Sequence, residues 1–465
     1  MNPRTTAAVA VGRVAGAASR ALGRGGGTAV AGLVAQRIDP ALVERLAAQL
    51  GQGAVVVSGT NGKTTTSRML AAIAGEAGLR PLANPSGSNL MRGVATALLD
   101  ETALLGRVHD ASQRLGVFEV DEATVPEAAR ALRPRAIVLT NLFRDQLDRY
   151  GEVDTVAALW RRALETLPDG AALVLSADDP AVASLRTDAK GPVLTYGIED
   201  IRVAEERLEH ASDYRFCLSC GEELSYAAAF YGHLGHWRCP ACGNARPRPD
   251  VRATCVEPSS SAMRLVVATP QGELRVELPL AGLYNVENAL AATAGALALG
   301  LPLDAVERAL GSFRAAFGRQ ERFEVDGRHV EVLLAKNPTG LNQVLRTIAS
   351  NGPAALHLLL FLNDDIQDGR DISWIWDADY ERLAGRVASA IVSGARAEEL
   401  ALRLKYAGFA IEPPIVHDAR AALDGALAQT PPGETLYVVP TYTAMLIVRE
   451  LLAKRGQRRP YWKEA

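Results

Sequence analysis

The sequence predicts two α/β domains, each built on a mostly parallel sheet. Short apolar runs alternate with helical stretches, and the alternation is interrupted once, between about residues 202 and 270. The length of 465 residues suits about two to four domains. Hydrophobic residues make up 48% and charged residues 22% of the chain, which excludes a wholly disordered or fibrous protein.

Charge and cysteine content narrow the function classes. The formal net charge of -3 gives no electrostatic basis for nucleic acid as the main partner, because dedicated binders usually carry a basic excess. Five Cys are too few for a disulfide framework, and four of them form two CxxC pairs. We therefore expect a protein of the reducing cytoplasm.

The N-terminal segment has an unusual composition. Its first 38 residues contain five Arg and no acidic residue, and Arg13 interrupts an apolar stretch from Ala7 to Ala18. This resembles a targeting peptide, but we favour an amphipathic helix that packs on the first domain near a membrane surface. No run of 18 apolar residues occurs, so no membrane span is predicted.

The first domain begins with a helical pattern over residues 40–50. The β-branched run Ala54–Val57 predicts a buried parallel strand. It leads into the glycine-rich stretch Gly59–Thr66 and a helix through Gly75. Further strands are expected at 115–120, 136–140 and 172–176, with a helix at 153–167. This alternation predicts a doubly wound sheet.

The later chain divides into an insertion and a second domain. All five Cys lie in the irregular stretch, which we interpret as an insertion at residues 205–255. Helical patterns return at 285–299 and 302–313, and we place the domain boundary at 318. The domain at 319–465 is expected to be a Rossmann-like α/β unit, with elements at 330–335, 340–349, 355–362, 387–392 and 435–439.

The strongest nucleotide signal is the stretch Gly59–Thr66, a shortened relative of the GxxxxGK[ST] loop. Its glycines and the following helix N-terminus free backbone amides for phosphate oxygens. Lys63 is expected to contact the β- and γ-phosphates of ATP, and Thr64 to hold Mg²⁺. The full expected phosphate-binding set is Gly59, Thr60, Asn61, Gly62, Lys63, Thr64 and Thr65.

Acidic and polar residues follow two later strands. The stretch Val117–Glu122 ends in three carboxylates, where a second Mg²⁺ ligand is needed, and we select Glu119. The alternative is an ordinary acidic strand end. Asn141–Asp148 follows the next strand and is expected to face the same crevice.

Four cysteines predict a structural zinc site. Cys217 and Cys220 are separated by 18 residues from Cys239 and Cys242, when counted between the inner pair, as in zinc ribbons. Four thiolates close the coordination sphere, so the metal is expected to be structural. The alternatives are four unrelated thiols, or a nucleic-acid-binding ribbon, for which the segment carries too little positive charge.

The order of the motifs resembles the Mur ligase superfamily, whose members phosphorylate a carboxylate with ATP and then form an amide bond. The resemblance rests on GTNGKTTT, FEVDE, NLFRDQLDRYGE, SADDP, YNVENALAA and FGRQER. It implies that Asn285 and Asn288 lie near the adenine and that Arg319 touches phosphates from the second domain. Without the resemblance, two Asn on a helix would indicate only capping or solvation.

Two departures argue against the ordinary amino-acid-adding members. This chain has Asp145-Gln146 where many members have Asp-His, and it has no Lys between Lys190 and Lys336 as a candidate carbamoylated lysine. The motifs LAKNPTG, DGRDISWIWDADYE, SGARAEELALRLKYAG and PTYTAM, together with the four cysteines, resemble one branch, the MurT family.

The MurT resemblance implies ATP-dependent amidation of the D-glutamate α-carboxylate of lipid II to D-isoglutamine. The ammonia would come from a GatD-type glutaminase partner, because Cys255, the cysteine left over, lacks a glutaminase-like turn. The resemblance also implies that an acid of this chain completes the partner's Cys-His pair, with Asp371 our first candidate and Asp368 the second. On local sequence, Asp371 is equally a cap of a helix at 372–383.

Two other function classes stay open on the sequence. One is an amino-acid-adding ligase of the muropeptide or folylpolyglutamate type, which needs an amino-acid pocket and no glutaminase. The other is a non-enzymatic, nucleotide-dependent zinc-ribbon scaffold. ATP turnover that depends on both lipid II and ammonia would separate the three. Contact with the membrane is expected to be peripheral, at its inner face, through the lipid substrate.

Overall fold

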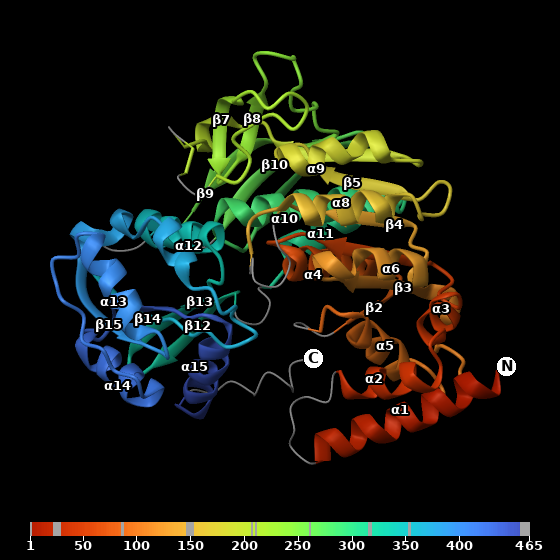
Figure 1. Ribbon diagram of the computed structural model, residues 1–465, viewed down its shortest axis with the longest axis horizontal. Coiled ribbons are helices and arrows are strands. Elements are labelled where there is room, and N and C mark those ends of the chain that lie inside the picture. Colours follow the sequence, from red (N-terminus) through yellow and green to blue (C-terminus); the bar gives the residue numbers. More distant parts are fainter. Residues whose placement is uncertain are drawn as a thin grey trace.

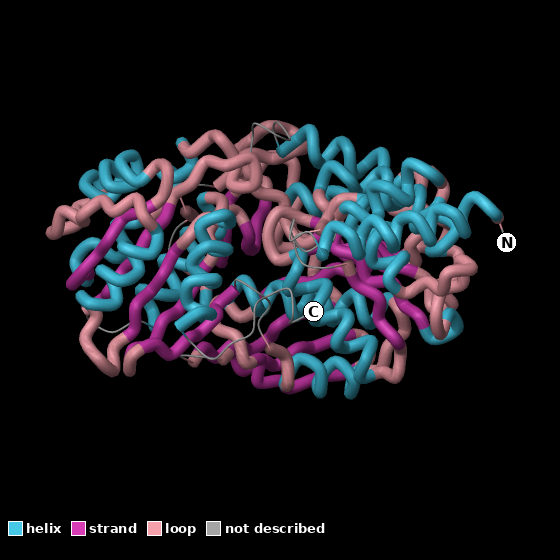
Figure 2. Tube along the Cα trace, turned by 90° about the horizontal axis from the view of Figure 1, so that it is seen from below, coloured by secondary structure: helices cyan, strands magenta, loops and turns pink. Residues whose placement is uncertain are grey.

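The computed structural model describes residues 2–21, 29–84, 88–145, 153–205, 208–209, 212–259, 262–314, 319–351 and 355–455. Figure 1 shows two sheet-based bodies side by side, with the N-terminal helices at one end of the first body. A small hairpin formed by β7 (Ser225–Tyr231) and β8 (Leu234–Arg238) lies at its other end. The same two bodies, turned by 90°, show strands lying between helices (Figure 2).

The first body contains a nine-stranded sheet in the order β11-β10-β9-β6-β5-β4-β1-β3-β2. All neighbouring pairs from β2 to β9 are parallel, and β10 and β11 extend the sheet antiparallel. The strands are β1 (Ala54–Ser58), β2 (Arg80–Ala83), β3 (Arg114–Glu119), β4 (Ala136–Leu139), β5 (Ala172–Ser176), β6 (Val193–Ile198), β9 (Val251–Pro258), β10 (Met263–Thr269) and β11 (Gly272–Leu278).

Helices cover both faces of this sheet, because its strands are apolar on both sides. In β1, Val55 and Val57 enter one core, whereas Ala54 and Val56 enter the other. The first core is covered by α4 (Lys63–Glu76), α10 (Leu283–Ala298) and α11 (Leu303–Gly311). The second is covered by α1 (Pro3–Ala21), α2 (Val30–Ile38), α3 (Leu42–Ala47), α5 (Met91–Asp100), α6 (Val125–Leu132), α8 (Val153–Leu164) and α9 (Pro180–Ser184). The predicted doubly wound architecture is confirmed.

The second body is a five-stranded sheet in the order β12-β13-β16-β14-β15, parallel except for β12. Its strands are β12 (Arg319–Val325), β13 (Arg328–Leu333), β14 (Leu356–Phe361), β15 (Val387–Ser393) and β16 (Thr435–Val439). One face packs against α12 (Pro338–Asn351) and α13 (Ala397–Tyr406), and the other against α14 (Ala419–Gln429) and α15 (Tyr442–Arg455). Among the helices of the described ranges, none combines the length and apolarity that crossing a bilayer requires.

The structure corrects two local predictions. Residues 251–255, which we assigned to the insertion, lie in β9, whose residues 251–253 pair with β6 of the main sheet. The helix expected at 372–383 is wrong, because the segment forms two 3-10 turns, η5 (Ser373–Asp377) and η6 (Tyr380–Arg386). Between them Ala378 is extended, and its carbonyl accepts a 2.6 Å hydrogen bond from the buried Arg403 guanidinium instead of a helical amide.

Candidate active site

The phosphate loop lies between β1 and α4, as the sequence predicts. Gly59 and Gly62 have φ values of +138° and +89°, a region that favours glycine. A Cβ atom at Gly62 would lie 2.0 Å from Asn288 Oδ1, so a side chain there would displace the buried Asn288. The loop therefore needs glycine for its backbone conformation and for the close approach of α10.

The end of β4 holds this loop in place. The amide of Asn61 donates to Asn141 Oδ1 (2.8 Å), and the carbonyl of Asn61 accepts from Thr140 Oγ1 (2.7 Å). The Thr60 hydroxyl donates to the carbonyl of Phe143 and accepts from its amide. Of the segment after Thr140, Asn141 lies against the loop, whereas Leu142 and Phe143 are buried in the two cores, and the expectation that the segment faces the nucleotide crevice stays a prediction. Gln146 and the residues up to Asp148 lie outside the described part of the chain.

Lys63 begins α4 and is buried, with its ammonium group turned back into the loop. Its Nζ atom donates to the carbonyls of Gly59 and Thr60 and lies 3.0 Å from Glu122 Oε1. Burial raises the pKa of Glu122 above its ordinary value of 4.5, while the positive charge of Lys63 acts in the opposite direction. Glu122, the last residue of FEVDE, is thus a functional candidate that was not predicted from the sequence.

The expected magnesium ligands lie at the ends of neighbouring elements. Thr64 is half-buried in the first turn of α4, and Glu119 is buried at the end of β3. The backbone of Glu119 exchanges two 2.9 Å hydrogen bonds with the side chain of Asn84. Threonine hydroxyl and carboxylate oxygens suit Mg²⁺ chemically, and the assignment of these two residues as its ligands stays a prediction.

The second domain reaches the phosphate loop through the start of α12. Asn337 Nδ2 donates to Asn61 Oδ1 (3.0 Å), and Lys336 Nζ donates to Asp145 Oδ2 (2.7 Å). A pocket opens at this junction and is lined from both domains by residues that include Asn61, Gly62, Tyr284, Asn288, Lys336, Asn337 and Gln343. Lys336 and Asn337 of the LAKNPTG motif were not predicted as site residues, because neither lies near the loop in sequence.

The structure describes the side chains of Asn285 and Asn288, expected near the adenine, but not that of Arg319, expected at the phosphates. Asn288 Nδ2 donates to Asn285 Oδ1 (3.2 Å), and Asn288 Oδ1 accepts from Thr66 Oγ1 (3.4 Å). Both Asn are buried in α10 beside the phosphate loop, and their contact with adenine stays a prediction. Arg319 is the first residue of β12, and its side chain lies outside the described part.

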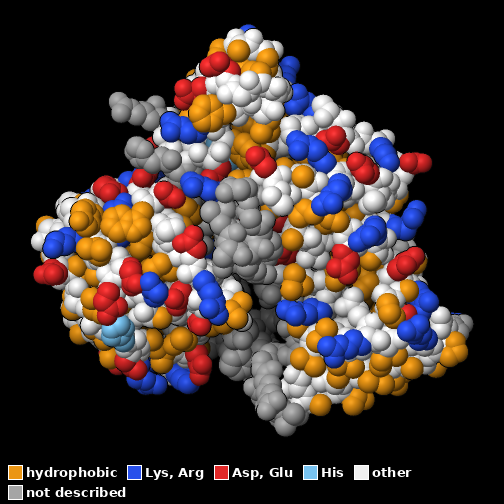
Figure 3. Space-filling view, in the orientation of Figure 1, with side chains coloured by type: hydrophobic (Ala, Val, Ile, Leu, Met, Phe, Trp, Pro, Cys, Tyr) orange, Lys and Arg blue, Asp and Glu red, His pale blue; other side chains and the backbone are white. Residues whose placement is uncertain are grey.

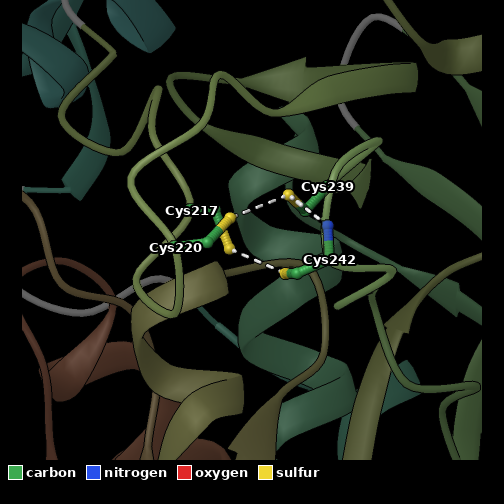
Figure 4. A group of neighbouring side chains, drawn as sticks. All are labelled: Cys217, Cys220, Cys239 and Cys242. Atoms are coloured by element: carbon green, nitrogen blue, oxygen red, sulfur yellow. Dashed lines mark hydrogen bonds between the residues drawn. The ribbon is translucent and has the colours of Figure 1, made fainter.

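The four cysteines meet in one cluster (Figure 4). Their sulfur atoms all lie within 4.8 Å of one another, with 3.6 Å between Cys217 and Cys242 and 3.4 Å between Cys220 and Cys239. A tetrahedral Zn²⁺ site with Zn–S bonds of about 2.3 Å needs sulfur separations of about 3.8 Å. The cluster therefore has the donor set and the size for one Zn²⁺.

The cysteine cluster is connected to the phosphate loop through the β7–β8 hairpin. His233, at the tip of the hairpin, is fully buried, with its ring 4.5 Å from that of Phe143. Phe143 is also the residue whose backbone holds Thr60. Trp237 of β8 packs beside Cys217 and Cys239 and donates to the carbonyl of Ala177 (3.0 Å). The insertion thus packs against Phe143, the residue that holds Thr60 of the phosphate loop.

Asp368 and Asp371 lie in very different surroundings. Asp368 is buried and accepts hydrogen bonds from the amide and hydroxyl of Thr443 at the start of α15. Burial raises the pKa of Asp368 above its ordinary value of 3.8, partly offset by those hydrogen bonds. Asp371 is exposed and accepts a 2.8 Å hydrogen bond from the amide of Ser373. Only Asp371 is therefore accessible from outside the chain.

Comparison with known proteins places these features in a family. The model of the Mur ligase middle domain matches residues 57–296, and that of the MurT ligase C-terminal domain matches residues 334–445. The chain is 33% identical over 457 residues to the lipid II isoglutaminyl synthase (glutamine-hydrolyzing) subunit MurT of Streptococcus pneumoniae, covering 98% of each chain. It is 32% identical over 451 residues to the subunit of the same name from Staphylococcus aureus, covering 97% of this chain and 98% of that one.

Solved structures show the same fold at low sequence identity. A pseudomurein peptide ligase type C from Methanothermus fervidus superposes with a TM-score of 0.65 and 24% identity, covering 86% of this chain and 78% of that one. MurF from Acinetobacter baumannii gives a TM-score of 0.67 at 18% identity, covering 93% of this chain and 80% of that one. With near full-length relatives at about one third identity, the chain belongs to the MurT family, a branch of the Mur ligases.

Proposed function

We propose that this chain is the ligase subunit of a lipid II isoglutaminyl synthase, an ATP-dependent enzyme that converts the D-glutamate α-carboxylate of the stem peptide to an amide. The observation that carries the proposal is a phosphate loop whose pocket is completed by Lys336 and Asn337 of the second domain. Lys63 and Lys336 lie on the two sides of the junction between the domains. Four of the five cysteines meet in one cluster, and Cys255 contacts Arg202 (3.2 Å) instead of a histidine.

The geometry supports two steps in sequence. The substrate carboxylate attacks the γ-phosphorus of ATP, forming a carboxyl–phosphate bond as the bond to ADP breaks. Ammonia then adds to the carboxyl carbon and expels phosphate, leaving the amide. Lys63 from the loop would stabilise the charge of the transferring phosphoryl group, and we infer that Lys336 and Arg319 add positive charge from the second domain.

Metal ions complete this proposal. Thr64 and Glu119 would hold Mg²⁺, which neutralises phosphate charge when bound. Zn²⁺ on Cys217, Cys220, Cys239 and Cys242 would fold the insertion, and so keep Phe143 against Thr60. We further infer that the chain divides into a ligase domain at 1–318, carrying the zinc-ribbon insertion, and a second domain at 319–465, since β12 opens the second sheet at Arg319.

The ammonia source is inferred to be a GatD-type glutamine amidotransferase subunit. A Cys-His pair on that subunit needs an acid to orient its imidazole, and the exposed Asp371 is our candidate for that acid. Asp368 is a poor one, because its carboxylate is buried and bonded to Thr443. The complex would work in the cytoplasm at the inner face of the membrane, where its lipid-linked substrate lies.

The test is amidation by the purified pair of subunits. ADP release should require lipid II together with either ammonium or glutamine, and glutamine should serve only when the partner is present. ATP turnover that depends on an added amino acid instead of ammonia would overturn the proposal in favour of an amino-acid-adding ligase. Absence of ATP turnover under every condition would favour a scaffold.

A further inference from the structure

The first helix of the chain is apolar on two opposite faces. Its inner face is buried against α2, where a Cβ atom at Gly12 would lie 2.9 Å from the Cβ of Ala35. Its outer face carries Ala7, Val11, Val14 and Ala18, all exposed and spaced by three or four residues, so that they form one stripe. A contiguous exposed apolar stripe of this kind marks a surface for a partner or a membrane.

Neighbouring elements extend this stripe into a larger surface. Val30 and Leu33 are exposed on α2, and Leu104 and Leu105 on the loop beside α1. We call Val11, Val14, Val30, Leu33, Leu104 and Leu105 the N-terminal apolar surface. Figure 3 shows hydrophobic side chains gathered along the lower right edge of the molecule, over α1. The bridge between Thr102 and Val108 and the bond from Arg13 Nη1 to the Thr102 carbonyl (3.0 Å) fix the loop against the helix.

Positive charge predominates on the two helices of this surface, since α1 and α2 contain no acidic residue and Arg4 and Arg13 are exposed, whereas Asp100 and Glu101 precede the loop of Leu104 and Leu105. The first 38 residues contain five Arg and no acid, and Arg37 is exposed in the last turn of α2. A second copy of the chain placed on the same surface would bring Arg against Arg, which is unfavourable. A protein partner would usually be bound through aromatic anchors, whereas all six residues of the surface are aliphatic. Aliphatic side chains flanked by Arg fit the interface of an anionic bilayer.

We propose that the N-terminal apolar surface rests on the anionic lipid surface of the membrane, with its aliphatic side chains at the headgroup boundary and the Arg side chains against lipid phosphates. The inference rests on the proposed function for its purpose, because a lipid-linked substrate requires the ligase to work at a bilayer. Binding would be peripheral and reversible, since the apolar area is small.

Vesicle flotation of the full chain tests the proposal. The protein should float with vesicles of phosphatidylglycerol and phosphatidylcholine, and several-fold less with phosphatidylcholine alone or at high salt. Val14 is 69% exposed, and Val14→Glu should lower the bound fraction about fivefold or more. Leu33→Glu gives a second, independent variant. Ile201→Glu is the matched control, because Ile201 is 63% exposed but lies outside the surface.

Three results would overturn the inference. They are no flotation with anionic vesicles, equal flotation of Val14→Glu and Ile201→Glu, and a concentration-dependent doubling of mass that Val14→Glu abolishes without any vesicle binding. Thermal melting checks that both glutamate variants are folded. Flotation needs no catalysis, so its outcome is independent of whether the chain amidates lipid II.

An activity comparison adds a second readout. In complex with the partner, Val14→Glu should keep its activity on a water-soluble, short-chain lipid II analogue and lose activity on lipid II embedded in anionic vesicles. Equal loss on both substrates would show that the substitution acts on the ligase itself and would count against the surface. Absence of activity in the wild type on either substrate would overturn the proposed function and leave the flotation result standing.

Discussion

The phosphate loop and the Asp-rich loop after β14 (residues 363–371) hold their charged groups in opposite ways. Lys63 is buried, and its ammonium is bonded to two carbonyls and Glu122 of its own domain. Asp371 is exposed and bonded to one amide two residues away. The difference is the one we expect if the phosphoryl-transfer groups are assembled within the chain, while the second loop offers its carboxylate to another molecule.

The same contrast appears within the Asp-rich loop. Asp368, only three residues before Asp371, is turned inward and caps α15 through Thr443. One acid thus holds the loop to the domain and the other is left accessible. If this division of roles is correct, substitutions at Lys63, Asp371 and Asp368 should affect different measurements.

The largest effect is expected at the phosphate loop. Lys63→Ala should abolish amidation with glutamine and with high ammonium alike, because it removes about 3 kcal/mol or more of transition-state stabilisation from the step that both routes share. Thr64→Ala should behave similarly. Lys454→Ala, at an exposed lysine paired with Glu450, is the control. Near-normal ADP release by both loop variants would refute the assignment of the loop.

Asp371→Asn should separate the two routes. It removes the charge that would orient the partner's imidazole and stabilise its protonated form, so glutamine-dependent amidation should fall by about two to four orders of magnitude. Amidation from ammonium should survive. Asp365→Asn, at another exposed acid of the same loop, is the matched control. Loss of both activities would place Asp371 in the ligase site, and no change in either would make it a surface acid.

The cysteine cluster should act through folding of the insertion. We expect one Zn²⁺ per chain by metal analysis, and loss of that metal together with a lower melting temperature in the Cys217→Ser/Cys239→Ser variant. Cys255→Ser, outside the cluster, should keep the metal. Because His233 packs on Phe143, the zinc-free protein should also bind ATP more weakly. Stoichiometric zinc in the double variant would exclude the site.

The smallest effect is expected at Asp368. Its pKa is raised above 3.8 by burial, so the folded protein holds this proton more tightly than the unfolded chain does. The contribution of Asp368 is therefore fully present below about pH 3.8 and declines as pH rises to the raised value. Relative to Asp368→Asn, the wild type should lose stability over that window. Denaturant unfolding from pH 3.5 to 7 measures the difference, and both amidation routes should change little and equally.

Local sequence was sufficient for the loop and the cysteines because their chemistry depends on short spacings. A β-branched run, two glycines and a helix define the Gly59–Thr66 loop, and two CxxC pairs define the cluster. Short spacings could not decide between Glu119 and Glu122. The carboxylate that lies near Lys63 is determined by how the 3-10 turn Glu122–Thr124 follows β3.

Contacts between distant segments could not be predicted from the sequence, for a different reason. Asn61 and Asn337 are separated by 276 positions, and Lys336 and Asp145 by 191. No periodicity connects such pairs, and only the docking of α12 on the first domain brings them together. The prediction of a helix at 372–383 failed for a similar reason, because the distant Arg403 guanidinium donates a hydrogen bond to the carbonyl of Ala378.

The coordination of Lys63 has a consequence for nucleotide affinity. An ammonium group has three hydrogens, and here the protein supplies three acceptors, the carbonyls of Gly59 and Thr60 and the carboxylate of Glu122. A phosphate oxygen can bond to Lys63 only by replacing one of these acceptors. Nucleotide binding therefore exchanges a protein acceptor of the Lys63 ammonium for a phosphate oxygen. The contribution of Lys63 to the binding free energy is the difference between the hydrogen bond gained and the hydrogen bond lost.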